Sequence, residues 1–302
     1  MYRLVDVQVA QHEYFADQAR NNTQREFTRN PARGDIRDAR GTLLATSKVV
    51  HNVCADPKLI GTNYFTVALN IAPLLGMPVE ELAEKLKPRS ITGSDGREIE
   101  VQWVSLKKKV ETEDWERVQE AMRKVSFGVD ESRMTATQRA PYDRVRNRGV
   151  FNEPDELRFY PSGTLASHVL GYVGLHVETN AQGRELQMRG KDGLEYALDD
   201  VLTGVKGWRQ TETDSRRREL VLYREQDVAP RHGLNAILTI DAGVQHIVEE
   251  ALAAAAERHD PVSITCVVVR PKTGEIVAMA NVPTFDPNHL GDCEPAARRN
   301  RT

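Results

Sequence analysis

ARGDIRDARGTLLATS, residues 32–47, places a charged, turn-rich segment directly before a run with strand character. Gly and Asp in RGDIRDARG are typical of turns, and residues 42–53 continue as a strand. Ahead of this stretch, residues 1–29 first alternate apolar with polar side chains and then become charged, which predicts an extended lead-in. The sequence therefore predicts that the chain enters its fold through a turn followed by a strand.

The next hundred residues mix helical and irregular patterns. Pro78 stands at the first turn of a predicted helix whose apolar residues recur at helical spacing from Val79 to Leu86. Thr112 is expected to cap a second helix with Trp115, Val118, Met122 and Val125 on its apolar face. Residues 130–156 are polar, rich in arginine and without a period, and are interpreted as a loop or as the return path of a small lobe.

The last third of the chain shows clearer periods. Residues 234–240 alternate as a strand, and Asp241 opens a helix with an apolar stripe. Two apolar runs, ITCVVV and IVAMANV, flank the turn Pro271-Lys272-Thr273-Gly274 and predict a β-hairpin over residues 264–282. Together with the preceding elements, these patterns indicate an α+β fold.

Lys272-Thr273-Gly274 raises the question of a penicillin-binding serine enzyme, because such enzymes use a Lys-Thr-Gly motif together with Ser-x-x-K and Ser-x-Asn. Ser105 and Lys108 form a Ser-x-x-K, but Ser-x-Asn is absent from the sequence. Glycine suits the tip of a hairpin, so the tripeptide is interpreted as a turn. The residues ahead of Ser105 alternate like a strand, whereas an active Ser-x-x-K opens a buried helix. An independent serine acyl-transferase using Ser105, Lys108 and Lys272 is therefore the weaker alternative.

Composition narrows the remaining classes of function. The 302 residues are enough for about two domains, and 28% charged residues with a mean hydropathy of −0.51 favour an extended, multi-part shape. With 41 basic and 44 acidic residues well mixed, no nucleic-acid partner is predicted. Cys54, Cys266 and Cys293 show neither metal-binding nor disulfide spacing; Cys266 is expected in the core. No metal, cofactor, membrane span or signal peptide is predicted.

Three motifs resemble one protein family. Residues 32–47 are similar to the R-G-x-I-x-D-R-x-G-x-x-L-A-x-S segment that opens the non-catalytic pedestal of class B penicillin-binding proteins, with Ala39 where the pattern has arginine. RFYPSGTLASHVLGYVG, residues 158–174, resembles the second pedestal motif of that family. GKDGLEYALDDVLTGVKGWRQ, residues 190–210, resembles the third. We call these three segments motif one, motif two and motif three.

The resemblance continues toward the end of the chain. Residues 233–252 look like the strand and helix that enter the transpeptidase domain, and TGEIVAMANVPTFDPN with ARRNR resembles the stretch just before the catalytic serine. The resemblance implies an elongated pedestal (dimerisation) domain over residues 1–232, with a head lobe near 54–150, and the start of a transpeptidase domain over 233–302. The catalytic motifs are expected beyond Thr302, and a membrane helix is expected ahead of Tyr2, so the chain is interpreted as a fragment without catalytic residues.

The resemblance also implies a function. Class B penicillin-binding proteins cross-link peptidoglycan on the outer, periplasmic side of the cytoplasmic membrane, and the D-P-N and A-R-R-N-R ending resembles the septal, cell-division type. The resemblance implies that this chain is a pedestal and interaction module. Its implied partners are a glycan polymerase and other cell-wall and division assembly proteins, with self-association also open.

The motif residues also have a physical interpretation. Arg33, Asp38, Arg158 and Glu195 come from three distant segments, and charged side chains at a shared junction would need to pair because an unpaired buried charge is costly. The alternative is that each of them is simply exposed. The glycines are expected at turns or close backbone approaches, Tyr160-Pro161 at an extended corner, and His168 as a hydrogen-bonded structural residue. The predicted structural and interaction residues are Arg33, Gly34, Asp38, Arg158, Tyr160, Pro161, Gly163, Gly171, Gly193, Glu195, Gly204 and Gly207.

Overall fold

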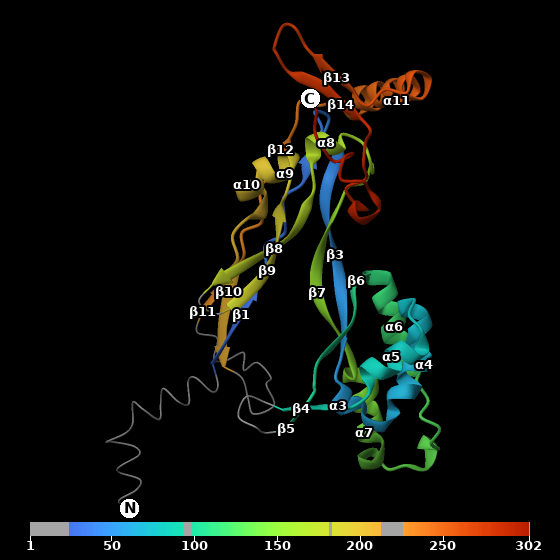
Figure 1. Ribbon diagram of the computed structural model, residues 1–302. Coiled ribbons are helices and arrows are strands. Elements are labelled where there is room, and N and C mark those ends of the chain that lie inside the picture. The colour runs from blue at the N-terminus through green and yellow to red at the C-terminus, as the bar shows by residue number, and fades with distance from the viewer. Residues whose placement is uncertain (1–23, 93–97, 181–182, 213–225, 302) are drawn as a thin grey trace, which may run out of the picture. The chain divides into compact units, whose positions relative to one another are not determined.

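The computed structural model describes residues 24–92, 98–180, 183–212 and 226–301, and its chain divides into two compact units (Figure 1). The insert unit comprises residues 48–157, and the main unit comprises residues 1–47 and 158–302. Strands β3 (Leu43–Ala55) and β7 (Val150–Phe159) carry the chain across the two boundaries. Helices and sheets are both present, so the predicted α+β class is confirmed. The domain boundary expected at residue 233 lies inside the main unit and stays a prediction.

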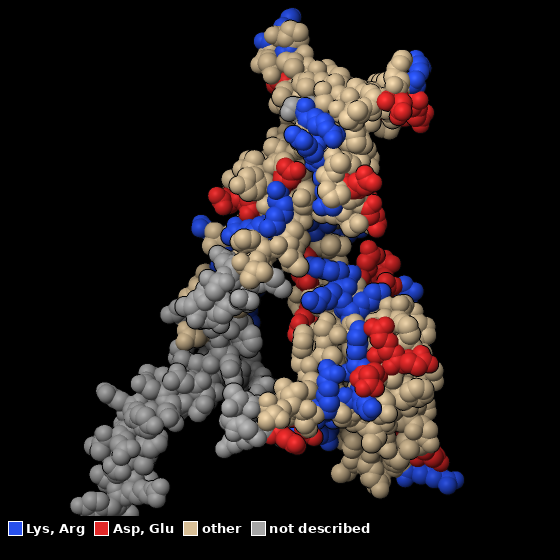
Figure 2. Space-filling view, in the orientation of Figure 1, with Lys and Arg blue, Asp and Glu red and all other residues tan. Residues whose placement is uncertain are grey.

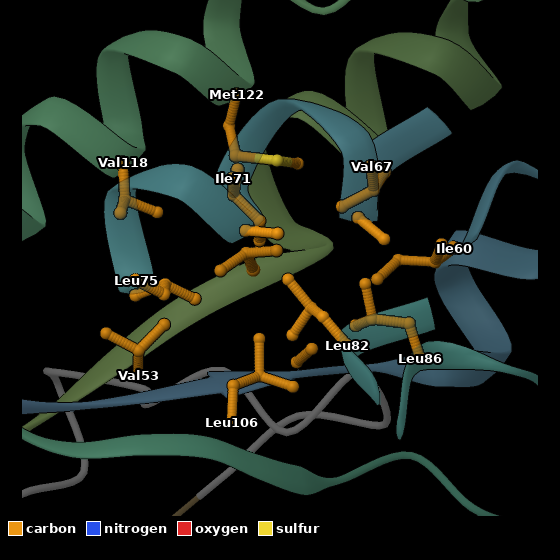
Figure 3. Close-up of a cluster of buried hydrophobic side chains, with 14 of the residues drawn as sticks. Val53, Ile60, Val67, Ile71, Leu75, Leu82, Leu86, Leu106, Val118 and Met122 are labelled. Carbon is orange, nitrogen blue, oxygen red and sulfur yellow. The ribbon is translucent and has the colours of Figure 1, made fainter. Parts of the chain in front are cut away.

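The insert unit packs helices against strands β3 and β6 (Val104–Glu111), which pair antiparallel. Figure 3 shows its core, a cluster of buried aliphatic side chains drawn from both helices and strands. The other elements are α3 (Pro57–Ile60), η2 (Gly61–Asn63), α4 (Tyr64–Leu75), α5 (Val79–Leu86), β4 (Ser90–Thr92), β5 (Glu98–Glu100), α6 (Thr112–Lys124), η3 (Glu131–Arg133) and α7 (Ala136–Arg148).

The two periodic helices of this unit are confirmed. Leu82 and Leu86 of α5 are fully buried, and Trp115, Val118 and Met122 form the buried face of α6. The prediction that Thr112 caps α6 is wrong, because β6 runs directly into the helix and Thr112 is already its first helical residue. A capping residue must keep non-helical dihedrals, and here Glu111 does so, without a side-chain bond.

Of the two alternatives for residues 130–156, the loop is wrong, whereas the return path fits, because β7 carries the chain back from the insert unit. These residues contain α7 and most of β7. The helix begins with a capping box between Thr135 and Gln138, a pairing that satisfies two backbone N–H groups at a helix start. Only Val145 of α7 is buried, so the helix carries no apolar stripe that a periodicity argument would detect.

The main unit consists of short sheets and helices. Strand β2 lies between β12 and β3, parallel to β12 and antiparallel to β3, and β1-β10-β11 form a separate antiparallel sheet. The strand predicted over residues 234–240 is regular only at β12. The elements are β1 (Gln24–Arg29), β2 (Ile36–Arg37), α8 (Ser167–Leu170), β8 (Val173–Asn180), β9 (Gly183–Gly190), α9 (Gly193–Ala197), α10 (Asp199–Thr203), β10 (Gly207–Glu212), β11 (Gln226–Val228), β12 (Ala236–Ile237), α11 (Ala242–His259), β13 (Ile264–Val269), β14 (Ile276–Val282) and η5 (Leu290–Asp292).

The predicted helix and hairpin at the end of the chain are confirmed. The side chain of Asp241 caps α11, and β13 pairs antiparallel with β14, beside α11 in Figure 1. Gly274 has φ of 77° in the connecting turn, where glycine is favoured. Cys266 is only half-buried, so its expected core position is wrong; in the described residues β13 belongs to a two-stranded sheet that covers it incompletely.

The surface carries both signs of charge. Figure 2 shows Lys and Arg interspersed with Asp and Glu on the face in view, in keeping with the near balance of the sequence. Among the helices in the described ranges, none has the length and hydrophobicity required to cross a membrane.

Candidate functional site

Three charged side chains from the three motifs meet in the main unit. Both carboxylate oxygens of Glu195 are used: Oε2 accepts a hydrogen bond from Arg33 Nε at 2.7 Å, and Oε1 accepts one from Arg158 Nε at 2.6 Å. The exposed fractions of these side chains are 0% for Glu195, 8% for Arg33 and 2% for Arg158. We call this group the charge junction. Its burial means that solvent screens these pairs much less than surface pairs.

Each arginine also binds beyond Glu195. Arg33 Nη1 donates to Asp199 Oδ1 at 2.7 Å and to Thr203 Oγ1 at 2.8 Å, both in α10. Arg158 Nη1 donates to the carbonyl oxygen of Gly34 at 2.8 Å. Arg158 thus reaches motif one through a backbone group and motif three through a carboxylate. The planar guanidinium group suits this role because its N–H groups point in several fixed directions.

The surroundings of the charge junction shift the pKa values of two neighbours. Burial, reinforced by the adjacent negative charge of Glu195, raises the pKa of the Tyr160 hydroxyl, which lies 3.4 Å from Glu195 Oε1 and stays neutral. Burial opposes ionisation of Asp199. The N–H of Gly190 and the guanidinium groups of Arg33 and Arg189 outweigh this effect and hold the pKa of Asp199 below its ordinary value.

Asp38 lies apart from the charge junction. Its buried carboxylate accepts hydrogen bonds from the backbone N–H groups of Arg40, Thr42 and Ala242, at 2.9, 2.7 and 3.1 Å. It therefore closes the turn of motif one and contacts the start of α11. Those N–H groups keep the pKa of Asp38 low, although burial acts in the opposite direction. Pairing with an arginine of the other motifs, as considered from the sequence, is wrong for this residue.

The motif glycines serve two kinds of backbone geometry. Gly34 allows close approach, because a Cβ at this position would lie 2.0 Å from the carbonyl oxygen of Leu234. Gly163 has φ of 58° with open space around it, so it serves a turn rather than a close contact. A Cβ at Gly171, Gly193, Gly204 or Gly207 would also meet backbone atoms at less than 3.0 Å.

Tyr160 and Pro161 mark a corner that is held from a distant segment. The backbone N–H of Tyr160 donates to Asn288 Oδ1, and its carbonyl oxygen accepts from Asn288 Nδ2, each at 3.0 Å. The chain then turns at Pro161, and the N–H of Gly163 donates back to the Tyr160 carbonyl oxygen. His168 is hydrogen-bonded to the Ala297 carbonyl oxygen at 2.8 Å, which confirms its structural interpretation.

The residues of the alternative acyl-transferase do not form a catalytic group. Ser105 and Lys108 both lie in β6, and the confirmed strand replaces the helix that would bring a lysine one turn away onto the serine hydroxyl. Side chains alternate faces along a strand, so an odd spacing directs these two apart. Lys272 lies in the hairpin turn of the main unit. Within the described ranges, no cluster of His, Cys, Asp or Glu is arranged to hold a metal ion.

Sequence reasoning missed Asp199, Thr203 and Asn288. Asp199 stands four residues after Glu195, a spacing at which two acidic side chains along neighbouring short helices can approach the same arginine. Asn288 carries no comparable signal, because its contacts to Tyr160 span 128 residues of sequence.

A known protein family matches the part of the chain that contains the three motifs. The family described as "Penicillin-binding Protein dimerisation domain" matches residues 28–235, which include all three motifs. The chain belongs to this family. The expected class of penicillin-binding proteins is thereby confirmed, and the charge junction lies wholly within the matched dimerisation domain.

Relatives among the penicillin-binding proteins are similar over nearly the whole chain. Stage V sporulation protein D of Bacillus subtilis is 28% identical over 97% of this chain and 39% of that protein. The probable peptidoglycan D,D-transpeptidase PenA of Neisseria meningitidis is 27% identical over 98% of this chain and 43% of its own length. The chain thus spans about two fifths of the length of these curated relatives.

Solved structures of penicillin-binding proteins share the fold. Penicillin Binding Protein 2X from Streptococcus thermophilus matches with a TM-score of 0.61 and 21% identity, over 90% of this chain and 37% of that one. PBP2 from Helicobacter pylori, solved in complex with MreC, matches with a TM-score of 0.59 and 19% identity, over 88% of this chain and 44% of that one.

Proposed function

We propose that this chain is the non-catalytic pedestal, with the start of the transpeptidase domain, of a class B penicillin-binding protein in peptidoglycan synthesis. The charge junction carries the proposal. Glu195 is fully buried, and each of its carboxylate oxygens binds an arginine. This carboxylate is therefore suited to holding three segments of the chain together. A catalytic carboxylate would instead need access to a substrate proton.

The whole protein is proposed to cross-link peptidoglycan stem peptides by serine acyl transfer and to bind penicillin. Support comes from relatives named peptidoglycan D,D-transpeptidase, among them PenA and FtsI of Escherichia coli, the latter 30% identical over 53% of this chain and 25% of its own length. We place the protein on the outer side of the cytoplasmic membrane, where its polymer is assembled. The septal type is proposed from the D-P-N and A-R-R-N-R ending.

Labelling with a fluorescent penicillin tests the non-catalytic assignment. An activated serine opens the β-lactam ring and stays acylated, so the 302-residue chain should remain unlabelled after denaturing electrophoresis. A transpeptidase with a complete catalytic domain serves as the positive control. Stoichiometric labelling that disappears in Ser105→Ala would instead establish the independent acyl-transferase.

Protein partners are proposed to include a glycan polymerase and other assembly proteins of the wall or the septum. Support comes from PBP2 of Helicobacter pylori, a protein with a similar fold that was solved in complex with MreC. Immobilised chain should bind the purified polymerase of the same organism, while Arg270→Ala, which alters an exposed hairpin charge, should bind equally well. Sedimentation of the same chain reports self-association. A fluorescent fusion of the whole protein at the lateral wall rather than at the septum would contradict the septal assignment.

A further inference from the structure

Residues 283–301 follow β14 without a strand or an α-helix and contain only the 3-10 turn η5 and two further short turns, at residues 286–289 and 294–297. Backbone hydrogen bonds of regular structure therefore do not fix the path of this segment. Side chains of motif two contact it instead. Ser167 Oγ lies 3.0 Å from Thr284 Oγ1, and Asn288 makes its two bonds to the backbone of Tyr160. We call residues 283–301 the exit segment.

His168 contacts the exit segment farther along the chain than Tyr160 and Ser167 do, at Ala297. Its Nε2 lies 2.8 Å from the carbonyl oxygen of Ala297, and a carbonyl oxygen only accepts, so Nε2 must carry the proton. The ring also packs edge-to-face on Phe285, with 5.1 Å between the ring centroids, and Phe285 is buried. One side chain of α8 thus holds two points of the exit segment that are twelve residues apart.

Asn300 closes the far end of the segment. Its Oδ1 accepts a hydrogen bond from Asn281 Nδ2 at 2.9 Å, and its Nδ2 lies 3.4 Å from the carbonyl oxygen of His168. Asn281 belongs to β14 and is itself buried. The exit segment therefore begins and ends at neighbouring positions, with α8 beside both.

We propose that motif two, through Tyr160, Ser167 and His168, is a clamp that fixes the exit segment, and that His168 is its positioning residue. This inference rests on the proposed function. On the proposed function the exit segment belongs to the start of the transpeptidase domain, so the clamp fixes how that start is held on the pedestal.

The reactivity of Cys293, inside the exit segment, provides a probe in the chain as it exists. Alkylation by iodoacetamide is followed by mass spectrometry of the peptides, with Cys266 in β13 as internal reference. His168→Ala should accelerate alkylation of Cys293 roughly 2- to 10-fold, the change expected from loss of one hydrogen bond that restrains local opening. His168→Gln places an amide donor near the position of Nε2 and should restore much of the protection.

Two further variants keep the test decisive. Asn300→Ala removes the closing contacts from an exposed residue, so it should fold and also accelerate Cys293. His246→Ala removes an exposed histidine of α11 and should change neither cysteine. Equal acceleration of Cys266 and Cys293, or an unchanged Cys293 in both His168→Ala and Asn300→Ala, would overturn the clamp. Neither result depends on penicillin labelling, so the proposed function is tested separately.

Discussion

Replacing Glu195 by alanine should be among the most damaging single changes in the main unit. The substitution leaves two guanidinium groups without their shared carboxylate. Arg33 keeps Asp199, whereas Arg158 keeps a hydrogen bond to the uncharged carbonyl oxygen of Gly34. Breaking a buried ion pair by removing one partner costs roughly 3–5 kcal/mol, because the remaining charge stays buried. We expect a loss of that size in the free energy of unfolding.

Arg33→Ala should cost less than Glu195→Ala. After that change Glu195 still binds Arg158, and Asp199 still binds Arg189 at 3.0 Å. Each charge-assisted hydrogen bond that is lost, to Glu195 and to Asp199, is worth about 1.5–3 kcal/mol, but neither carboxylate is left unpaired. The Arg33–Glu195 bond is lost in either single variant and only once in the double variant, so the combined loss should fall short of the sum by about 0.5–3 kcal/mol. Glu195→Gln keeps the shape but not the charge, and should resemble Glu195→Ala.

Urea unfolding followed by circular dichroism measures these differences, with hydrogen exchange of peptides from residues 158–203 locating them in the main unit. The exposed pair Arg270–Glu275, with side-chain exposures of 58% and 39%, is the matched control. Glu275→Ala should cost only about 0–1 kcal/mol, as exposed pairs do. If Glu195→Ala were as mild as Glu275→Ala, or additive with Arg33→Ala, the charge junction would not stabilise the unit as argued.

Three further outcomes are expected. Gly34→Ala should lower the free energy of unfolding by roughly 3 kcal/mol, because the new Cβ meets a backbone oxygen. Gly163→Ala, where the space is open, should lower it by only about 1 kcal/mol because of the positive φ at this position. Equal losses in urea unfolding would contradict this. Burial lowers the pKa of His168 below its ordinary 6.5, so its contribution to stability is present above pH 6.5 and declines as the pH falls below it; His168→Gln should lack that part of the pH dependence in thermal unfolding. Amides of residues 264–282 should exchange faster than those of β3 in a monomeric sample, because the apolar side chains on one face of the hairpin remain exposed; equal protection would refute this.

The sequence predicted those elements whose apolar side chains recur with a period. Helices α5, α6 and α11 and the β13–β14 hairpin could be predicted in this way, because burial of one face makes apolar residues recur at a fixed spacing in the sequence. Helix α7 was not, because Val145 is its one buried side chain and its start is marked only by the Thr135–Gln138 capping box. A search for capping patterns alongside periodicity would have found it.

The sequence predicted which residues form the candidate site better than it predicted which of them contact one another. The motifs singled out Arg33, Arg158 and Glu195, but charge alone does not say which carboxylate meets an arginine and which meets backbone N–H groups. Asp38 binds backbone N–H groups because it lies in a tight turn with the N–H donors of Arg40 and Thr42 nearby. Asp199 binds an arginine because the backbone of motif three brings it alongside Arg33.

Motif two holds its neighbours by two different kinds of interaction, and the difference has a physical reason. Toward motifs one and three it presents Arg158, whose bonds are charge-assisted and buried. Toward the exit segment it presents the Tyr160 backbone, the Ser167 hydroxyl and the His168 ring, whose contacts are neutral hydrogen bonds and an aromatic edge. Buried charge pairs are costly to break singly, whereas each neutral bond contributes only about 0.5–1.5 kcal/mol net. The motifs are therefore joined firmly to one another, while the exit segment is held by several weaker contacts that can open one at a time.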